Sequence, residues 1–360
     1  MVNTQIQQFF KDKRVMVTGH TGFIGSWLVK SLLMLGSNVC GFALNPYSNP
    51  NLFDTLKLSS QIRDFRYDIL DRKILKEIID NFSPEIVFHL AAQPIVLEGY
   101  NNPADTFNIN VTGTVNLLDI LRRNNSIREI VVMTSDKVYR NNEWVYPYRE
   151  IDPLGGTDPY SASKSCQDIV VNSFRESYFL NRGIAVSTVR AGNVIGGGDW
   201  SAFRIVSDLV RGMINNQSVS IRNPRSTRPW QHVLNLVSEM LVLTFSMRSD
   251  TSFSGNWNFG PNPSEKRSVK DLTEKFISYW GNGSYSTNEE GNWKESKQLQ
   301  LDTSKARSAF GKAVDIPFEE ALMLTVDWYK TFYYDFDNVN RITEEQIRSY
   351  IMNGRYYGQI

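Results

Sequence analysis

Residues 14–35 read RVMVTGHTGFIGSWLVKSLLML, and this stretch decides the fold. The β-branched run 14–18 predicts a short strand, and the apolar spacing over 23–35 predicts a helix that ends at Gly36. Between them lies the spacing G-x-x-G-x-x-G, formed by Gly19, Gly22 and Gly25. Glycines at such a turn let backbone N–H groups approach a pyrophosphate at the helix N-terminus. The stretch therefore predicts a dinucleotide-binding Rossmann unit.

The pattern of strand followed by helix continues from this unit to about residue 190. Further strands are expected at 38–44, 65–67, 85–90, 130–133 and 185–190. Helices are expected at 71–81, 103–124 and 160–180. This alternation predicts the α/β class, with a doubly wound parallel sheet.

Beyond residue 190 the regular pattern degrades, and we expect a second, smaller part of the molecule. Residues 1–190 are assigned to the dinucleotide-binding domain, and a segment of about 232–260 is expected to return to it. Residues 191–330 are expected to form mainly a mixed C-terminal substrate-binding lobe. The tail, 331–360, carries many aromatic residues, which are more often used for packing than for function.

Composition excludes several classes of protein. The net charge of the 360 residues is +1, which gives no electrostatic case for a nucleic-acid partner or an anionic membrane. The two cysteines, Cys40 and Cys166, favour buried thiols in a reducing compartment. The three histidines are far apart, so no metal site is expected. No apolar run of about 18 residues occurs, and we expect a cytoplasmic protein.

Two residues bear on the choice of cofactor. The Rossmann pattern places an acid about 20 residues after the glycine loop, where it binds the ribose. Asn45 stands there, and its neutral amide can bind a ribose hydroxyl without repelling a 2′-phosphate. No arginine lies close by in sequence to attract such a phosphate, so NAD is favoured and NADP stays open. Asp68 is expected to meet the adenine amino group, or else to be an ordinary loop or N-cap residue.

Candidate chemistry lies at the stretch TSDKVY, residues 134–139, which ends a buried strand. About 20 residues later, Tyr160 and Lys164 stand at i and i+4 on a helix, so their side chains share one face. A lysine ammonium beside a phenol is expected to lower the pKa of the phenol. Such a tyrosine can accept the proton of an alcohol while hydride leaves the same carbon.

Several stretches together resemble the extended short-chain dehydrogenase/reductases that act on nucleotide sugars. They are VTGHTGFIGSW (17–27), VFHLAAQ (87–93), NINVTGTVNLLDILR (108–122), TSDKVY (134–139), YSASK (160–164) and VRAGNVIGG (189–197). Two longer stretches, TSDKVYRNNEWVYPYRE (134–150) and IRNPRSTRPWQHV (221–233), resemble the CDP-glucose 4,6-dehydratases more narrowly. The resemblance covers residues 12–240 well.

This resemblance implies a lyase that performs a redox-neutral elimination in deoxysugar biosynthesis, such as that of lipopolysaccharide O-antigen. Tyr160, assisted by Lys164 and the hydroxyl of Ser135, would deprotonate the C4 hydroxyl of glucose as hydride passes to NAD. Lys137 would remove the C5 proton, and Asp136 would protonate the departing C6 hydroxyl. Thr134 and Ser135 are expected to turn their hydroxyls toward the sugar. A homodimer through helices 103–124 and 160–180 is also implied.

Further residues follow from the motifs. The cofactor set is Gly19, His20, Gly22, Phe23, Ile24, Gly25, Asn45, Asp68, Ile69, Leu90, Ala91, Ala92, Gln93, Asn110, Tyr160 and Lys164. The substrate set is Gln93, Ser135, Asn193, Arg204, Arg222 and Arg228, with the glycines 196–198 facing a pyrophosphate. Asn110 falls in mid-helix, where asparagine is a poor helix former, so a buried contact near the cofactor is expected.

The sequence leaves alternatives open. Ile24 stands where the dehydratase loop often carries a lysine, which affects the expected preference for NAD over NADP. A nucleotide-sugar 4-epimerase or reductase needs the tyrosine and NAD but not Asp136 and Lys137. A non-catalytic dinucleotide sensor needs none of these side chains. CDP-glucose is the first substrate expected, and another nucleotide hexose is the alternative.

Overall fold

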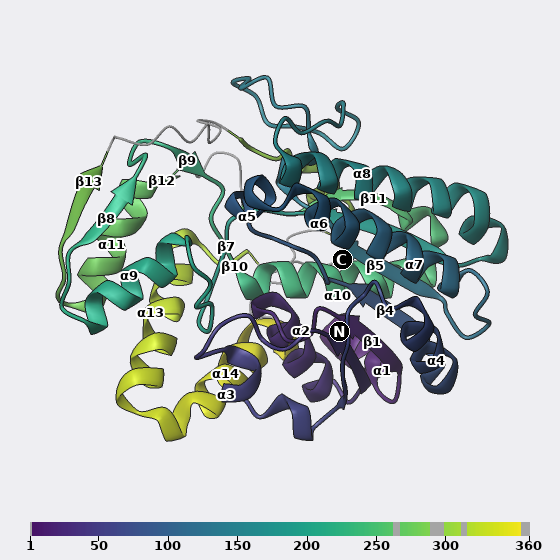
Figure 1. Ribbon diagram of the computed structural model, residues 1–360. Helices are drawn as coiled ribbons and strands as arrows, with labels where there is room; N and C mark the ends of the chain where they lie inside the picture. Colours follow the sequence, from purple (N-terminus) through teal and green to yellow (C-terminus); the bar gives the residue numbers. More distant parts are fainter. Residues whose placement is uncertain (1, 262–266, 289–298, 311–314, 354–360) are drawn as a thin grey trace.

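The computed structural model describes residues 2–261, 267–288, 299–310 and 315–353 (Figure 1). Its centre is a seven-stranded sheet of order β11-β6-β5-β4-β1-β2-β3, in which every neighbouring pair is parallel. The strands are β1 (Arg14–Thr18), β2 (Asn38–Ala43), β3 (Arg63–Arg66), β4 (Ile86–His89), β5 (Glu129–Met133), β6 (Ala185–Arg190) and β11 (Gly255–Asn258). The strand order reverses between β1 and β4, which is where doubly wound sheets bind their ligands. The predicted fold class is confirmed.

Helices cover both faces of this sheet because its strands alternate their side chains between two apolar clusters. Val15 and Val17 of β1 join the cluster that includes α2 (Phe23–Met34) and α10 (Val233–Ser249). Met16 joins the opposite cluster, with α4 (Arg72–Phe82), α7 (Gly113–Leu121) and α8 (Pro159–Phe174). The N-terminal helix α1 (Val2–Phe10) packs on α10.

Two predicted helices are less regular than expected. The segment predicted as one helix over 103–124 consists of α6 (Pro103–Phe107), a π-helical turn η2 (Asn108–Thr112) and α7. π-Helical turns inside helices occur often at functional sites. The second helix was expected to reach residue 180, but α8 ends at Phe174. It continues as the π-turn η4 (Arg175–Phe179) and the 3₁₀ turn η5 (Leu180–Arg182), which Gly183 ends with a φ of 65°.

The smaller part of the molecule lies at one side of the sheet, at the left of Figure 1. It pairs β8 with β13 in parallel and β9 with β12 antiparallel. Its elements are α9 (Ile205–Ile214), β8 (Val219–Arg222), β9 (Thr227–Arg228), β12 (Arg267–Ser268), α11 (Val269–Trp280), β13 (Tyr285–Asn288) and α13 (Phe318–Tyr334). The remaining α-helices and strands are α3 (Leu52–Thr55), α5 (Val96–Asn101), β7 (Val194–Ile195), β10 (Gln231–His232), α12 (Ser304–Phe310) and α14 (Val339–Ile347).

The chain after β10 runs back to the main sheet. α10 packs on α2, and β11 pairs with β6 at the edge of the sheet. Aromatic residues of α13 are buried as well: Trp328 and Tyr329 are fully covered, and the Tyr329 hydroxyl donates to the carbonyl of Asp199 at 2.6 Å. Within the described residues, no helix combines the length and the apolar character needed to cross a membrane.

Candidate active site

The glycine loop after β1 is shaped by close backbone contacts. Gly19 has a φ of +75°, and a Cβ there would lie 2.6 Å from the amide nitrogen of Ala91. A Cβ on Gly25 would lie 2.2 Å from the carbonyl oxygen of Gly19. Gly22 caps α2 without any side-chain hydrogen bond to the first turn. Because the first N–H groups of a helix lack intrahelical partners, this cradle fits a dinucleotide pyrophosphate.

The side chain of His20 packs against β2 and is hydrogen-bonded to β3. The imidazole is fully buried, and its Nε2 lies 2.8 Å from an oxygen of Asp64. A Cβ on Gly41 would lie 2.4 Å from this ring, so β2 needs a glycine here. Burial lowers the pKa of His20, and the hydrogen bond that His20 donates to Asp64 opposes this shift. The predicted cofactor contact of His20 is therefore left to its backbone.

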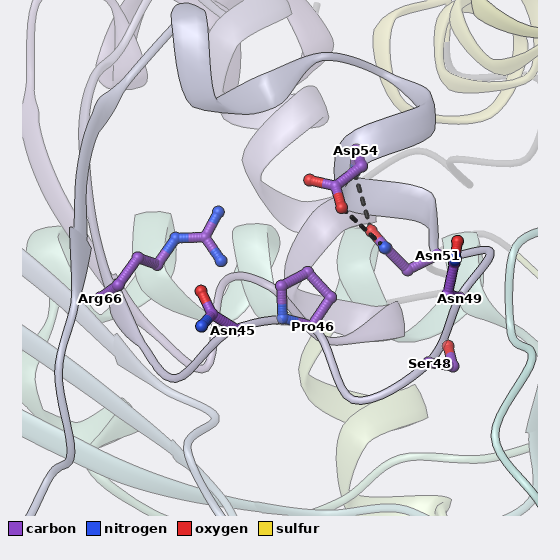
Figure 2. Close-up of a pocket in the computed structure, with 7 residues that line it drawn as sticks. All are labelled: Asn45, Pro46, Ser48, Asn49, Asn51, Asp54 and Arg66. Atoms are coloured by element: carbon purple, nitrogen blue, oxygen red, sulfur yellow. Dashed lines mark hydrogen bonds between the residues drawn. The ribbon is translucent and has the colours of Figure 1, made fainter.

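A pocket of about 400 Å³ opens at the end of β2 (Figure 2). Its lining residues are Asn45, Pro46, Ser48, Asn49, Asn51, Asp54 and Arg66. Arg66 is distant in sequence, but it pairs with Ala43 in the register of β3 against β2. Its guanidinium donates to both oxygens of Asp64, at 2.7 and 2.9 Å. The pocket thus places Asn45 beside Arg66, whose guanidinium is already paired with Asp64. In the sequence, no arginine lies close to Asn45.

Asp68 and Ile69 follow β3 as expected, but one alternative for Asp68 is wrong. Its carboxylate accepts the N–H of Leu70 at 2.9 Å in a local turn. The N-cap of α4 is Asp71, which accepts from the N–H of Ile74. Ile69 is buried against Gly113, where a Cβ would lie 2.6 Å from its side chain.

The segment after β4 is tied down by two amide side chains. Asn110 is fully buried, as predicted, and exchanges hydrogen bonds with the backbone of Gln93 at 2.8 and 3.2 Å. It also donates to Ser163 at 2.9 Å, which joins this segment to α8. The side chain of Gln93 bonds to Thr106 and to the N–H of Ile95. The side chain of Gln93 therefore stabilises its own loop, and its expected contact with a substrate stays a prediction.

A buried acid stands at the carboxyl end of β5. Ser135 caps the short turn η3 (Asp136–Val138) by accepting the N–H of Lys137 at 3.2 Å. The Ser135 hydroxyl donates to one oxygen of Asp136 at 3.1 Å. The other oxygen of Asp136 is buried without a partner in the described structure. A Cβ on Gly192 would lie 2.1 Å from that oxygen, so a glycine is required opposite the acid.

Tyr160 lies beside this acid, and its pKa differs from our expectation. Burial raises the pKa of Tyr160 to about 12; the hydrogen bond from Ser135 lowers it and the charge of Asp136 raises it. Lys164 is not bonded to the phenol: its amine donates to the carbonyl of Met133 at 3.2 Å and to Gln167 at 2.8 Å. The expected lowering of the tyrosine pKa by Lys164 is therefore absent from this arrangement.

Burial also governs Lys164. It lowers the pKa of the amine to about 7, and the charge of Asp168 opposes that shift.

The structure also shows where Thr134 and Lys137 lie at the end of β5. Thr134 does not face a substrate, because its hydroxyl is directed to the carbonyl of Val189 and to Asp168, at 3.2 and 3.3 Å. Lys137 is half-buried at the turn, next to the acid.

The predicted substrate residues divide into two groups. Arg204 is brought to the site: its charge acts on Tyr160, and its guanidinium lies 3.5 Å from Asp199. Arg222 stacks over Phe203 at 6.0 Å in the smaller part. Arg228 bonds to the carbonyl of Thr227 in β9.

The remaining substrate predictions lie between β6 and β10. Asn193 has a φ of 49°, and its carbonyl accepts from Gln231. The glycines 196–198 do not face outward but are buried, and a Cβ on Gly197 would lie 2.1 Å from Trp328. The indole of Trp27 donates to the carbonyl of Gly197 at 2.9 Å. These glycines are required for close packing against Val233, Trp328 and Leu52, and their expected contact with a pyrophosphate stays a prediction. No group of three or more potential metal ligands occurs among the described residues.

A parallel sheet with a glycine loop at its switch point, and a buried tyrosine and lysine at the neighbouring strand end, define a short-chain dehydrogenase/reductase. Residues 16–323 match the family described as GDP-mannose 4,6 dehydratase. The chain is 42% identical over 333 residues to a CDP-glucose 4,6-dehydratase of Salmonella typhimurium, covering 91% of this chain and 93% of the relative. The chain therefore belongs to the GDP-mannose 4,6 dehydratase family, and the predicted relationship to nucleotide-sugar dehydratases is confirmed.

Solved structures show the same fold at lower identity. A Thermus thermophilus UDP-glucose 4-epimerase in complex with NAD superposes with a TM-score of 0.76 at 22% identity, over 88% of this chain and 99% of its own. A Bacillus anthracis dTDP-glucose 4,6-dehydratase in complex with NAD gives 0.76 at 21% identity, over 91% and 99%. Both dehydratases and epimerases thus share this fold.

Proposed function

We propose that the protein is a nucleotide-sugar 4,6-dehydratase, a lyase that converts CDP-D-glucose to CDP-4-keto-6-deoxy-D-glucose and water. The observation that carries this proposal is the buried Asp136, which keeps one oxygen unpartnered beside Tyr160. A 4-epimerase has no use for an acid at this point, whereas loss of a hydroxyl as water requires one. The 42% identity to a CDP-glucose 4,6-dehydratase supports the choice of substrate.

NAD is the cofactor, and it supplies the hydride acceptor for C4 and the hydride donor for C6. The loop from Gly19 to Gly25 would hold its pyrophosphate at the N-terminus of α2. Asn45 would bind a ribose hydroxyl from the pocket at the end of β2. Asp68 would meet the adenine amino group, and the small residues Ala91 and Ala92 would let the cofactor approach the backbone. Two similar folds, an epimerase and a dehydratase, were solved with NAD, which supports this assignment.

The side chains at the end of β5 divide the proton transfers among them. Tyr160, in its phenolate form and hydrogen-bonded to Ser135, takes the proton of the C4 hydroxyl as C4 is oxidised. The new ketone acidifies C5, whose proton passes to Lys137. Asp136 in its acid form then protonates the C6 hydroxyl, and the C6–O bond breaks to release water. Hydride would return from the reduced cofactor to C6, the proton on Lys137 would return to C5, and the proton on Tyr160 would restore the acid form of Asp136, so the overall reaction is redox-neutral.

The finer assignments are proposals of the same kind. Residues 1–190 with 232–260 form the dinucleotide-binding domain, and 191–330 form mainly the substrate lobe, where Arg204, Arg222, Arg228 and Asn193 contact the nucleotide sugar. Two chains form a homodimer through α6–α7 and α8, which expose Phe107 and Ile169. The two unpaired thiols support a cytoplasmic enzyme of deoxysugar biosynthesis, such as that of O-antigen.

The proposal is tested by incubating the protein and NAD with CDP-, UDP-, GDP- and dTDP-glucose, followed by mass spectrometry. Loss of one water from CDP-glucose in preference to the others is the expected result. Loss of water from another nucleotide alone would overturn the substrate assignment. A product of unchanged mass but altered C4 configuration would replace the dehydratase by an epimerase. Alkaline absorbance of the 4-keto product provides an independent readout.

A further inference from the structure

A buried polar side chain contacts the amine of Lys164. Gln167 is fully buried, and it lies three residues after Lys164 on α8. The lysine amine donates to its Oε1 at 2.8 Å, and its Nε2 donates to Thr114 at 2.9 Å. Because an ammonium can only donate, the carbonyl oxygen of Gln167 must face the lysine. The amide group is then directed to Thr114.

The contact to Thr114 continues as a chain of hydrogen bonds. The Thr114 hydroxyl donates to the carbonyl of Asn110 at 2.7 Å, so its second partner, Nε2 of His89 at 2.9 Å, must donate to it. Nδ1 of His89 is then an acceptor, and Thr18 donates to it at 2.7 Å. The oxygen of Thr18 in turn accepts the N–H of Ala91 at 3.3 Å. Each donor in the chain has an assigned acceptor.

Burial keeps this chain in one arrangement. Thr18, His89, Thr114 and Gln167 are all fully buried, so rotating any of them would strand a polar group without water. Burial, and secondly the charge of Lys164, lower the pKa of His89 to about 3, which agrees with a neutral ring that donates only from Nε2. The chain therefore fixes the orientation of Gln167.

We propose that Gln167 is a positioning residue for the dehydration: it holds the amine of Lys164 in place, and Thr114 and His89 hold Gln167. The inference rests on the proposed function, and on the role that the family resemblance implies for Lys164, which is to assist Tyr160. The far end of the chain is the amide of Ala91, which abuts Gly19 of the cofactor loop. The same hydrogen bonds thus join the lysine to the backbone against which the cofactor loop packs.

The alternative is that Gln167 only fills space in the core. The two possibilities differ in what happens to Lys164. A hydrogen-bond acceptor favours the charged amine, so replacing it by an apolar group of similar size should make the amine lose its proton at lower pH. A space-filling residue would have no such effect on the lysine.

The test compares Gln167→Leu and Gln167→Glu in full-length protein with NAD and CDP-glucose. For Gln167→Leu we expect kcat to fall about 10–100-fold, the effect of a small misplacement of a catalytic group, with KM little changed. The alkaline limb of the kcat–pH profile should move to lower pH. For Gln167→Glu it should move to higher pH, because a carboxylate favours the ammonium. Thr114→Val should reproduce the leucine shift in weaker form.

Matched controls separate this inference from the proposed function. Thr244 is equally buried and bonds only to the carbonyl of Met240 in its own helix, so Thr244→Val should keep the wild-type pH profile. An unchanged profile in both Gln167 variants, or shifts of the same sign, would overturn the inference. If Gln167→Leu does not fold, the kcat–pH profiles of Gln167→Glu and Thr114→Val decide between a positioning role and a space-filling role. Full activity in Lys164→Ala would instead overturn the proposed role of the lysine itself.

Discussion

Two buried aspartates lie on either side of the Tyr160–Lys164 pair, and they are treated in opposite ways. Asp168, on α8, is fully covered and accepts two hydrogen bonds from Arg190, at 2.8 and 2.9 Å. Asp136, at the end of β5, is 3% exposed, and its side chain is hydrogen-bonded only to Ser135. Its other oxygen has no partner among the described residues.

The difference separates structure from chemistry. A buried carboxylate that is paired with a cation and hydrogen-bonded stays charged and can hold neighbouring segments of the core together. A buried carboxylate without a cation is costly, and folds keep such groups mainly where they act. We therefore assign Asp168 to the scaffold and propose Asp136 for the reaction, although both are hydrogen-bonded to residues at the carboxyl ends of β5 and β6.

The largest expected effect comes from Asp136→Asn. Because the amide cannot protonate the C6 hydroxyl, kcat should fall by about 10²–10⁴-fold, the usual contribution of a positioned acid. Oxidation at C4 should survive, so exchange of the C5 proton with deuterated solvent should continue while release of water stops. Stability should change little, since no cation is left unpaired. Mass spectrometry measures the loss of water and the exchange at C5, and urea unfolding measures the stability.

Lys137→Ala is the counterpart on the same turn. If Lys137 is the C5 base, this variant should lose exchange at C5 as well as product formation. An Asp136→Asn protein that forms product at the wild-type rate would remove the acid from the mechanism. Full exchange in Lys137→Ala would move the C5 base to another group and leave the role of Asp136 standing.

The second effect falls on the paired aspartate. Asp168→Asn leaves the guanidinium of Arg190 buried beside a neutral amide, and breaking a buried pair from one side costs about 3–5 kcal/mol. The free energy of unfolding in urea should drop by this order. Because the charge of Asp168 raises the pKa of Lys164, the kcat–pH profile of the protein that remains folded should move to lower pH. Loss of kcat without loss of stability would make Asp168 part of the chemistry and would break the comparison.

The third effect tests how closely Asp136 is held. In Gly192→Ala the new Cβ would lie 2.1 Å from the free oxygen of Asp136, so the acid must move. A displacement of this kind should lower kcat by about 10–100-fold and leave NAD binding unchanged. Gly183→Ala, where a Cβ meets nothing within 4 Å, is a control for the general cost of replacing glycine in a turn. Equal kcat in both variants would show that the acid does not need this fit.

How far the sequence predicts such features depends on whether they are local. The glycine loop, the strand ends and the Tyr160–Lys164 spacing are local patterns, and the structure has the expected strands at each of them. The partners of these residues come from distant segments. Arg66 reaches Asn45 only through strand register, and Gly192 meets Asp136 only because β6 lies beside β5. The packing of Gly197 against Trp328 could not be predicted for the same reason, since Trp328 lies more than a hundred residues away.

Gln167 illustrates a different limit. A glutamine within a helix carries no local signal, and it gains meaning only when α7 and β4 supply Thr114 and His89 as partners. The motifs also point to Gln93 and His20. The side chains of these residues are hydrogen-bonded to Thr106 and Asp64, which come from other segments of the chain. Sequence patterns thus locate the strand ends but do not assign the hydrogen bonds there.

The smallest effect concerns a third buried carboxylate, Glu129, at the opposite end of β5 from Asp136. Burial raises its pKa to about 7, against the opposing charges of Arg248, Lys13 and Arg128. Between pH 4.5 and 7 the folded protein holds a proton that the unfolded chain has lost, so stability should fall as pH rises and level off above 7. The loss should reach about 1–3 kcal/mol. Glu129→Gln should flatten the curve over this window and be the more stable protein at pH 8, as measured by urea unfolding, whereas Asp168→Asn should be less stable than wild type at every pH.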